Sequence, residues 1–137
     1  RSEINFMHIT MASNKKILQY RHESDTWKRY LQFIQQENNH LKNRLSQVLQ
    51  ADTDYEFLER AEYFQNKFIS EDDTVNMLRQ DIHELDKLLA KEAGEDSVVL
   101  KELQKRLKKM HKDMEIVEKQ FNKLKSDFNL YLTETIA

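Results

Sequence analysis

A heptad pattern of apolar residues between Phe57 and Leu89 limits the chain to a narrow set of folds. Its positions are separated by alternating steps of four and three residues, which is the spacing of one narrow stripe on a long helix that packs against other helices. Nine of its ten residues are apolar, and the tenth is Glu71. The pattern comprises Phe57, Ala61, Phe64, Phe68, Glu71, Val75, Leu78, Ile82, Leu85 and Leu89. We therefore expect a helix over about residues 54–92.

Two further heptad patterns flank the first one and are typical of neighbouring helices. The earlier pattern comprises Ile17, Tyr20, Ser24, Trp27, Leu31, Ile34, Asn38, Leu41, Leu45 and Val48. The later pattern comprises Leu100, Leu103, Leu107, Met110, Met114, Val117, Phe121, Leu124, Phe128 and Tyr131. We expect helices over about residues 13–51, with Ser13 as N-cap, and 97–133. Residues 1–12 lack such a period and are expected to form an N-terminal tail that packs against the bundle or a second copy.

Few residues interrupt this helical pattern, because the chain contains one glycine and no proline. Thr53 and Glu56 form a capping-box sequence at the start of the second helix. Gly94 is the clearest stop signal, and Asp96 or Ser97 can cap the helix that follows. Two short connections make consecutive helices antiparallel. The sequence therefore predicts an all-α protein, an antiparallel up-down-up three-helix bundle of coiled-coil-like helices about 55 Å long, forming a single domain over residues 13–137.

One alternative divides the second helix, because Ser70-Glu71-Asp72-Asp73 resembles an N-cap sequence and could start a new helix after a turn. However, the heptad phase passes unchanged from Phe68 to Val75, whereas a loop would normally reset it. A continuous second helix is therefore preferred.

The composition excludes several classes of chemistry. The chain has no cysteine, which excludes disulfides, thiolate nucleophiles and cysteine-containing metal sites, and which fits a cytoplasmic location. No run of about eighteen apolar residues suggests a membrane span, and residues 1–11 do not resemble an intact signal peptide. The net charge is −2, so no general attraction to nucleic acid is expected.

Asn38 and Glu71 are the polar residues expected in the central core. With turns near residues 52 and 94, they fall in one layer, and we expect a hydrogen bond between them, with Gln35 and Gln120 as further partners. An unpaired charge in such a layer would be costly. The preferred role is a polar pair that sets the helix register. The alternative is a small metal- or ligand-binding site around Glu71 and Asn38.

Other combinations of residue types do not support a catalytic or metal site. Glu37-x-x-His40 matches one element of di-iron helical bundles, but those sites need a second such element, which the chain lacks. His111 and Glu115 form a one-turn pair on the surface. No serine or threonine is accompanied by a base and an orienting acid. We therefore expect no metal, no cofactor and no catalytic residue, and the chain is not predicted to be an enzyme.

Basic residues gather early in the third helix. They are Lys101, Lys105, Arg106, Lys108, Lys109 and Lys112. One interpretation is a surface that binds acidic polymers or anionic lipid. The preferred interpretation is a solvated face that pairs with Asp81, Glu84 and Asp86, which should lie alongside on the antiparallel second helix.

Several large apolar residues lie outside the heptad patterns. At the third heptad position, which faces outward, are Phe33, Tyr63, Met77, Ile116 and Leu130. Leu18, Leu49 and Ile69 add to this set. Their recurrence at one position predicts a second contact surface for a protein partner or a second copy, as in a homodimer. The alternative is that a wide core or the N-terminal tail covers them. The sequence thus favours a non-catalytic interaction or scaffolding bundle.

Three segments resemble small bacterial long-helix proteins to which no function is assigned. These segments are Trp27–Leu31, Glu37–Leu45 and Tyr63–Phe68. The resemblance implies a cytoplasmic helical bundle and supplies no site residues. In shape, the predicted architecture also resembles a spectrin repeat, with a tryptophan in the first helix but none in the third.

Overall fold

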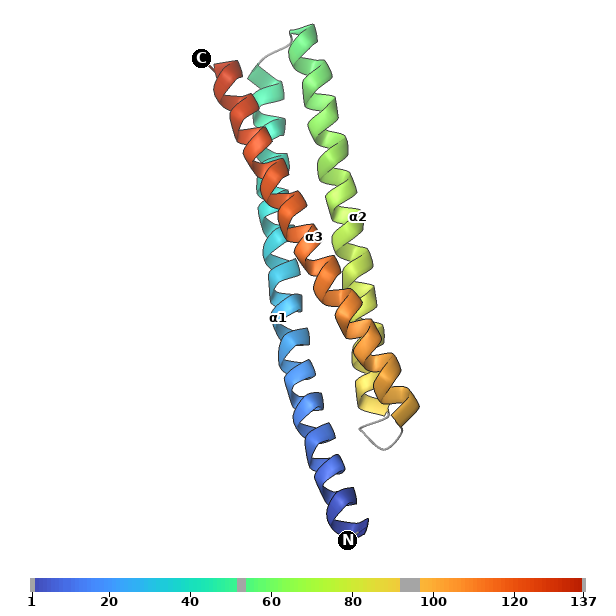
Figure 1. Cartoon of the computed structure of the whole chain (residues 1–137). Coiled ribbons are helices and arrows are strands. Elements are labelled where there is room, and N and C mark those ends of the chain that lie inside the picture. Colours follow the sequence, from blue (N-terminus) through green and yellow to red (C-terminus); the bar gives the residue numbers. More distant parts are fainter. Residues whose placement is uncertain (1, 52–53, 92–96, 137) are drawn as a thin grey trace. The chain divides into compact units, whose positions relative to one another are not determined.

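Three long helices form the protein, as predicted. The computed structural model describes residues 2–51, 54–91 and 97–136, with side chains for 15–51, 54–90 and 98–134. The helices are α1 (Ser2–Ala51), α2 (Tyr55–Lys91) and α3 (Ser97–Ile136) (Figure 1). Within the described ranges the chain contains no strand. The all-α helical bundle is therefore confirmed.

The first helix starts earlier than predicted. It begins at Ser2 rather than near Ser13, so the interpretation of Ser13 as an N-cap is wrong. The reason is that no glycine or proline occurs before Gly94, so nothing in this segment ends a helix. The prediction that residues 1–12 pack against the bundle or a second copy concerns side chains outside the described set.

The other helix ends lie within a few residues of those predicted. The Leu58 amide donates to the Asp54 carbonyl at 2.9 Å, so Asp54 supplies the first acceptor of α2. Ser97 is the first residue of α3, which continues to Ile136 rather than ending near residue 133. The predicted roles of Thr53, Gly94 and Asp96 fall outside the described residues.

The second helix is continuous through Ser70–Asp73, which confirms the preferred interpretation. The Thr74 hydroxyl donates to the Ser70 carbonyl one turn earlier, at 3.1 Å. Such a bond to the carbonyl four residues earlier is made by threonines within a helix. The acidic Ser70–Asp73 segment is therefore an interior turn of α2, not a cap.

Every helix contributes to two compact units. Unit 1 comprises Arg1–Tyr30 and Leu78–Met114, and unit 2 comprises Leu31–Met77 and Glu115–Ala137. Each unit thus contains one segment of α1, one of α2 and one of α3. The single domain expected from the sequence stays a prediction.

Unit 1 is built around Trp27, which is 7% exposed. Its ring packs edge-on against the His111 ring, with 5.0 Å between centroids. The Ser24 hydroxyl, at a polar position of the first heptad pattern, donates to the Asp86 carboxylate at 2.6 Å. This bond satisfies a buried hydroxyl that would otherwise destabilise the core.

Unit 2 is built around an aromatic cluster contributed by α2 and α3. Phe64 packs against Tyr131 with centroids 5.0 Å apart, and Phe68 meets Phe128 edge-on at the same distance. The buried Tyr131 hydroxyl donates to the Phe57 carbonyl at 3.1 Å. Because residue numbers rise along α2 as those of their partners fall along α3, the two helices are antiparallel in this unit.

The heptad patterns correctly identify the buried side of all three helices. All ten residues of the α2 pattern are buried. In the other two patterns the exceptions are half-buried residues, namely Tyr20, Val48, Leu100 and Leu124. Leu132 is also buried, at 2% exposure, although it lies next to the pattern rather than in it. The periodicity therefore predicts the core closely, because each helix buries one stripe.

Candidate functional site

Asn38 is buried in unit 2, but its partners differ from those predicted. Its Nδ2 donates to the Phe68 carbonyl at 2.9 Å and to Asp72 Oδ1 at 2.8 Å. Lys42 on α1 forms an ion pair with the other oxygen of Asp72. The predicted hydrogen bond between Asn38 and Glu71 is therefore wrong. Adjacent residues of a helix point about 100° apart. Asp72 therefore points toward α1, whereas Glu71 lines a groove between α2 and α3.

Glu71 is a buried carboxyl group without a matching donor. It is 6% exposed, and no side-chain or backbone donor of the described chain reaches its Oε1. Burial, with a smaller contribution from the charge of Asp72, raises the pKa of Glu71 from 4.5 to about 7. Gln120, a predicted partner, lies nearby without donating to it. Such a group loses hydration without gaining a hydrogen bond, which destabilises its charged form.

Glu71 lines a groove of about 240 Å³ between α2 and α3 of unit 2, which we call the Glu71 groove. Its lining residues are Tyr63, Lys67, Ser70, Glu71, Thr74, Gln120, Lys123, Leu124 and Asp127. Both lysines have contacts of their own. Lys67 Nζ lies 5.5 Å from the centre of the Tyr63 ring. Lys123 Nζ lies 3.0 Å from Asp127 Oδ2, and this hydrogen bond raises the pKa of Lys123. The groove therefore contains a buried carboxyl oxygen and two lysines, and these lysines contact Tyr63 and Asp127 rather than Glu71.

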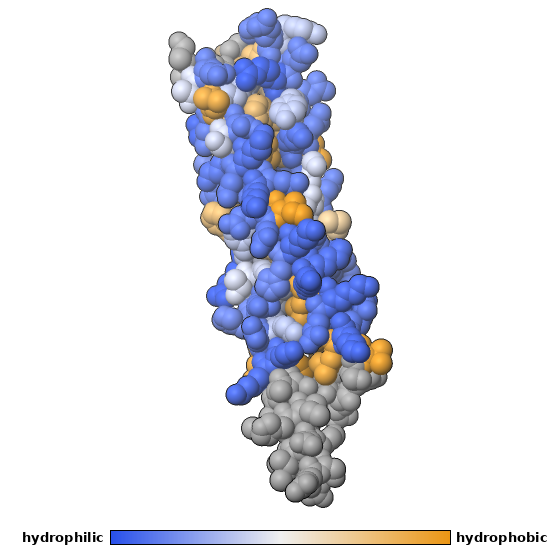
Figure 2. Space-filling view, viewed as in Figure 1, coloured by the Kyte–Doolittle hydropathy of each residue, from blue (hydrophilic) through white to orange (hydrophobic). Residues whose placement is uncertain are grey.

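The five apolar residues proposed as a contact surface are all exposed and all belong to unit 2. Their exposed fractions are 49% for Phe33, 56% for Tyr63, 56% for Met77, 43% for Ile116 and 60% for Leu130. On the face in Figure 2, hydrophobic residues are scattered among hydrophilic ones over most of the surface and gather at its lower end. The side chains of the described chain thus leave these residues uncovered, against the alternative of a wide core.

Ion pairs identify the groove on which these residues lie. Arg60 Nη1 on α2 lies 3.4 Å from Glu134 Oε2 on α3, so heptad position g of both helices borders the groove between them. The third heptad position is the next outward position on the same side as g. Four of the five candidates therefore border the α2–α3 groove, namely Tyr63, Met77, Ile116 and Leu130. Phe33 does not border this groove. Glu37, at position g of α1, forms an ion pair with Lys125 on α3 at 2.9 Å, so the side of α1 that carries Phe33 borders α3 instead of α2.

Sequence reasoning missed some exposed apolar residues and misplaced one. Tyr55, Leu58 and Val98 are 78%, 42% and 72% exposed, in or next to the first turns of α2 and α3. Their exposure could have been predicted, because all three lie outside the heptad patterns. Leu49, expected to be exposed, is half-buried. Leu18 and Ile69 are exposed as expected, at 65% and 49%.

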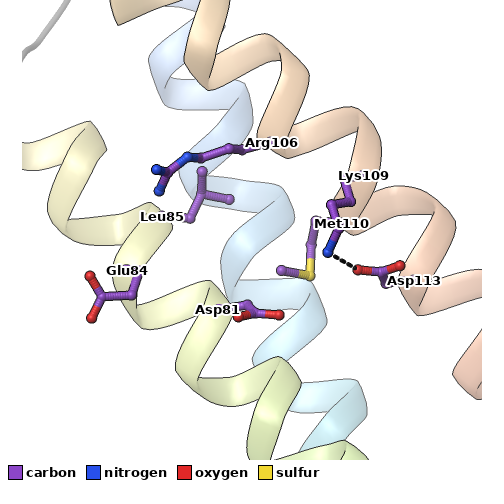
Figure 3. A pocket seen from close by; sticks show the side chains of 7 residues that line it. All are labelled: Asp81, Glu84, Leu85, Arg106, Lys109, Met110 and Asp113. Carbon is purple, nitrogen blue, oxygen red and sulfur yellow. Dashed lines mark hydrogen bonds and ion pairs between the residues drawn. The ribbon is translucent and has the colours of Figure 1, made fainter.

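Two residues of the basic cluster, Arg106 and Lys109, pair along α3 rather than across to α2. Arg106 Nε lies 3.2 Å from Glu102 Oε1, and Lys109 Nζ lies 3.1 Å from Asp113 Oδ2. Figure 3 shows Arg106 and Lys109 on α3 at a groove of about 280 Å³ that Asp81 and Glu84 line from α2. The predicted cross-helix pairing is therefore wrong, because partners one turn away on α3 are closer.

The third predicted acid, Asp86, faces α1 instead. It accepts the hydrogen bond from Ser24 and forms an ion pair with Lys28. As a result, four lysines of α3 have no acidic group within ion-pair distance in the described part of the chain. We call these exposed residues the lysine stripe: Lys101, Lys105, Lys108 and Lys112. Their spacing of four, three and four residues aligns them along the outer side of α3.

Glu37 and the histidines whose side chains are described do not converge on one another. His111 Nε2 lies 3.1 Å from Glu23 Oε2 on α1, so its partner is Glu23 rather than Glu115. Glu37 pairs with Lys125, and His40 is exposed. Among the side chains that the structure describes, no group of three or more histidine, aspartate or glutamate residues could hold a metal ion.

Comparison with known proteins finds no matching family model, no matching curated protein and no matching solved structure. None of the helices, over their described residues, is both long and apolar enough to cross a membrane. The site must therefore be interpreted from its own geometry, whose main features are the Glu71 groove, the apolar residues beside it and the lysine stripe.

Proposed function

We propose that the protein is a non-catalytic interaction module of the cytoplasm that associates with a second copy of itself through unit 2. The contact surface consists of the exposed apolar residues that border the α2–α3 groove. The cytoplasmic location rests on the absence of cysteine from the sequence.

The main support for this proposal is that exposed apolar side chains from two helices border the same groove. Tyr63 and Met77 on α2, and Ile116 and Leu130 on α3, are each at least 43% exposed. Exposed apolar residues scattered singly are normal on a protein surface. Recurrence of large ones at one heptad position of two adjacent helices is typical of a helix-packing surface.

Sedimentation equilibrium over a wide concentration range tests self-association. We expect the wild-type chain to associate reversibly, and the double variant Tyr63→Ser with Leu130→Ser to remain monomeric. The matched control is Leu18→Ser with Val98→Ser, which removes two apolar residues of unit 1 that are at least as exposed. A wild-type chain that stays monomeric at every concentration contradicts the proposal.

A second candidate function is binding of an acidic polymer by the lysine stripe. Four cations in a row without acidic partners in the described chain favour this function, because such groups attract linear polyanions. The net charge of −2 makes the attraction local.

Binding to heparin tests this second candidate. The variant with glutamine at Lys101, Lys105, Lys108 and Lys112 should bind more weakly and with a smaller dependence on salt concentration. A control with glutamine at four other exposed lysines, Lys15, Lys16, Lys87 and Lys119, should resemble the wild type. Equal loss in both variants would reduce the effect to net charge, and binding to anionic vesicles alone would indicate a lipid surface instead.

A further inference from the structure

We propose that two copies of unit 2 associate about a twofold axis parallel to the helices, so that α2 of each copy lies on α3 of the other and basic residues face acidic ones. This inference rests on the proposed self-association and names the surface and geometry through which it occurs. It draws only on residues of unit 2.

At heptad position g the two sides of the α2–α3 groove carry opposite charges, and Lys123 on α3, which also lines the groove, forms an ion pair with Asp127. Along position g, α2 presents Arg60 and Lys67, whereas α3 presents Asp127 and Glu134. The ion pair between Arg60 and Glu134 sets these two residues at the same height. One heptad further into the unit, Lys67 and Asp127 line the same groove from opposite helices. Unit 2 therefore has a basic row on α2 and an acidic row on α3 at matching heights.

The exposed apolar residues occur in pairs at matching heights as well. Counting from the Arg60–Glu134 pair, Tyr63 on α2 lies within one residue of the level of Leu130 on α3, and Met77 lies within one residue of the level of Ile116. Fourteen residues separate the two pairs on each helix, or about 21 Å. The polar Glu71 groove lies between the two pairs. The surface is thus an apolar pair, a polar centre and a second apolar pair.

A twofold axis parallel to the helices matches all of these groups at once. Rotation about such an axis preserves height and exchanges the two sides, so α2 of one copy opposes α3 of the other at the same level. Lys67 then faces the partner's Asp127, and Tyr63 faces the partner's Leu130. An axis across the helices would instead place α2 on α2 and α3 on α3, which separates the basic row from the acidic one. Charge complementarity therefore selects the parallel axis.

The contacts within one copy leave these charges available. The side chains of Arg60 and Glu134 are 56% and 55% exposed, and those of Lys123 and Asp127 are 78% and 49% exposed. Exposed ion pairs of this kind contribute little to stability and are easily exchanged. Lys123, which by the same count is level with Glu71, would also lie over the partner's Glu71 groove.

Complementary charge reversal tests this geometry. Variant A carries Arg60→Glu and Lys67→Glu, and variant B carries Asp127→Lys and Glu134→Lys. Each variant alone would place like charges opposite each other, so each should associate more than about tenfold more weakly than the wild type. An equimolar mixture restores opposite charges on both sides of a mixed dimer and should recover association.

Matched controls separate this effect from instability and from net charge. The control Arg44→Glu with Lys119→Glu makes the same charge change as variant A on exposed positions of unit 2 away from this groove. Thermal unfolding followed by circular dichroism checks that each variant folds. If variant A does not fold, Arg60→Gln with Lys67→Gln removes the attraction without introducing repulsion and should still weaken association.

The outcomes distinguish this inference from the proposed function. A wild-type chain that never associates overturns both. A wild-type dimer whose affinity is unchanged in variants A and B overturns the geometry and leaves self-association standing. Weakened variants whose mixture fails to recover also overturn the geometry, whereas recovery only in the mixture supports it.

Discussion

Asn38 on α1 donates a hydrogen bond to Asp72 on α2, with 2.8 Å between Nδ2 and Oδ1. Glu71, the preceding residue, belongs to the heptad pattern and is buried, yet its Oε1 has no donor within the described residues. The polar layer of unit 2 therefore contains an amide nitrogen, Asn38 Nδ2, whose hydrogen bonds join α1 to α2, and two buried oxygens, Asn38 Oδ1 and Glu71 Oε1, without a donor among the described residues. Asn38 and Glu71 respond differently to mutation.

Replacing Asn38 by aspartate should destabilise the protein strongly. Asn38 is fully buried, and a carboxylate there would face Asp72 instead of donating to it. An uncompensated buried charge costs about 3–5 kcal/mol. Urea unfolding at neutral pH measures the loss. The adjacent Asn39→Asp, at an exposed position, should change stability by less than about 0.5 kcal/mol, and equal effects of the two substitutions would contradict the role assigned to Asn38.

Replacing Glu71 by glutamine should change how stability depends on pH. Because the folded pKa of about 7 lies above 4.5, the folded protein binds the proton more tightly than the unfolded chain does. The stabilisation from this group is therefore complete below pH 4.5 and is lost as the pH rises through about 7, up to about 3 kcal/mol in all. Glu71→Gln should be more stable than the wild type above pH 7, with the difference shrinking toward pH 4.5.

The measurement for Glu71 is urea unfolding of both proteins across this pH range. Charged neighbours on all three helices, Lys42, Lys67, Asp72, Lys123 and Asp127, are retained in both proteins, so the difference isolates residue 71. The exposed Glu62→Gln serves as the control and should show no pH-dependent difference. Glu71→Leu should likewise be neutral or stabilising above pH 7 while loosening the uniqueness of assembly. A large loss of melting temperature in that variant would exclude the assigned burial cost.

Truncating Phe68 should be among the most destabilising core changes. It is completely buried and packs against Phe64 and Phe128. Phe68→Ala should cost about 3–5 kcal/mol, because the lost contacts leave a cavity between α2 and α3. Thermal unfolding compares it with Ile69→Ala, whose side chain is 49% exposed and whose loss should have a small effect.

Removing the Tyr131 hydroxyl should have a smaller, measurable effect. The hydroxyl donates to the Phe57 carbonyl near the end of unit 2. Tyr131→Phe keeps the ring contacts with Phe57 and Phe64 but loses this bond, at a cost of about 1 kcal/mol. Tyr55→Phe, at a position 78% exposed, is the control. Identical stability of the wild type and Tyr131→Phe would show that this hydrogen bond does not contribute.

The candidate site was only partly predictable from the sequence. The third heptad position correctly indicated that Tyr63, Met77, Ile116, Leu130 and Phe33 face outward. It could not indicate that four of them share one groove while Phe33 does not. Heptad position specifies how far a residue lies from the core, whereas the neighbour on each side depends on how the three helices are arranged around it.

The sequence by itself determined the three helices, the continuity of α2 and the buried stripe on each, because apolar residues at alternating steps of four and three lie along one side of a helix. Only the tertiary structure decided that Asn38 bonds to Asp72, that Asp86 turns to α1 and that the lysine stripe has no acidic partner within the described chain. The physical reason is that adjacent helical residues point about 100° apart, and side-chain partners depend on which helix lies within reach. The heptad period of the sequence predicts which residues are buried, whereas the polar contacts depend on how the neighbouring helices are arranged.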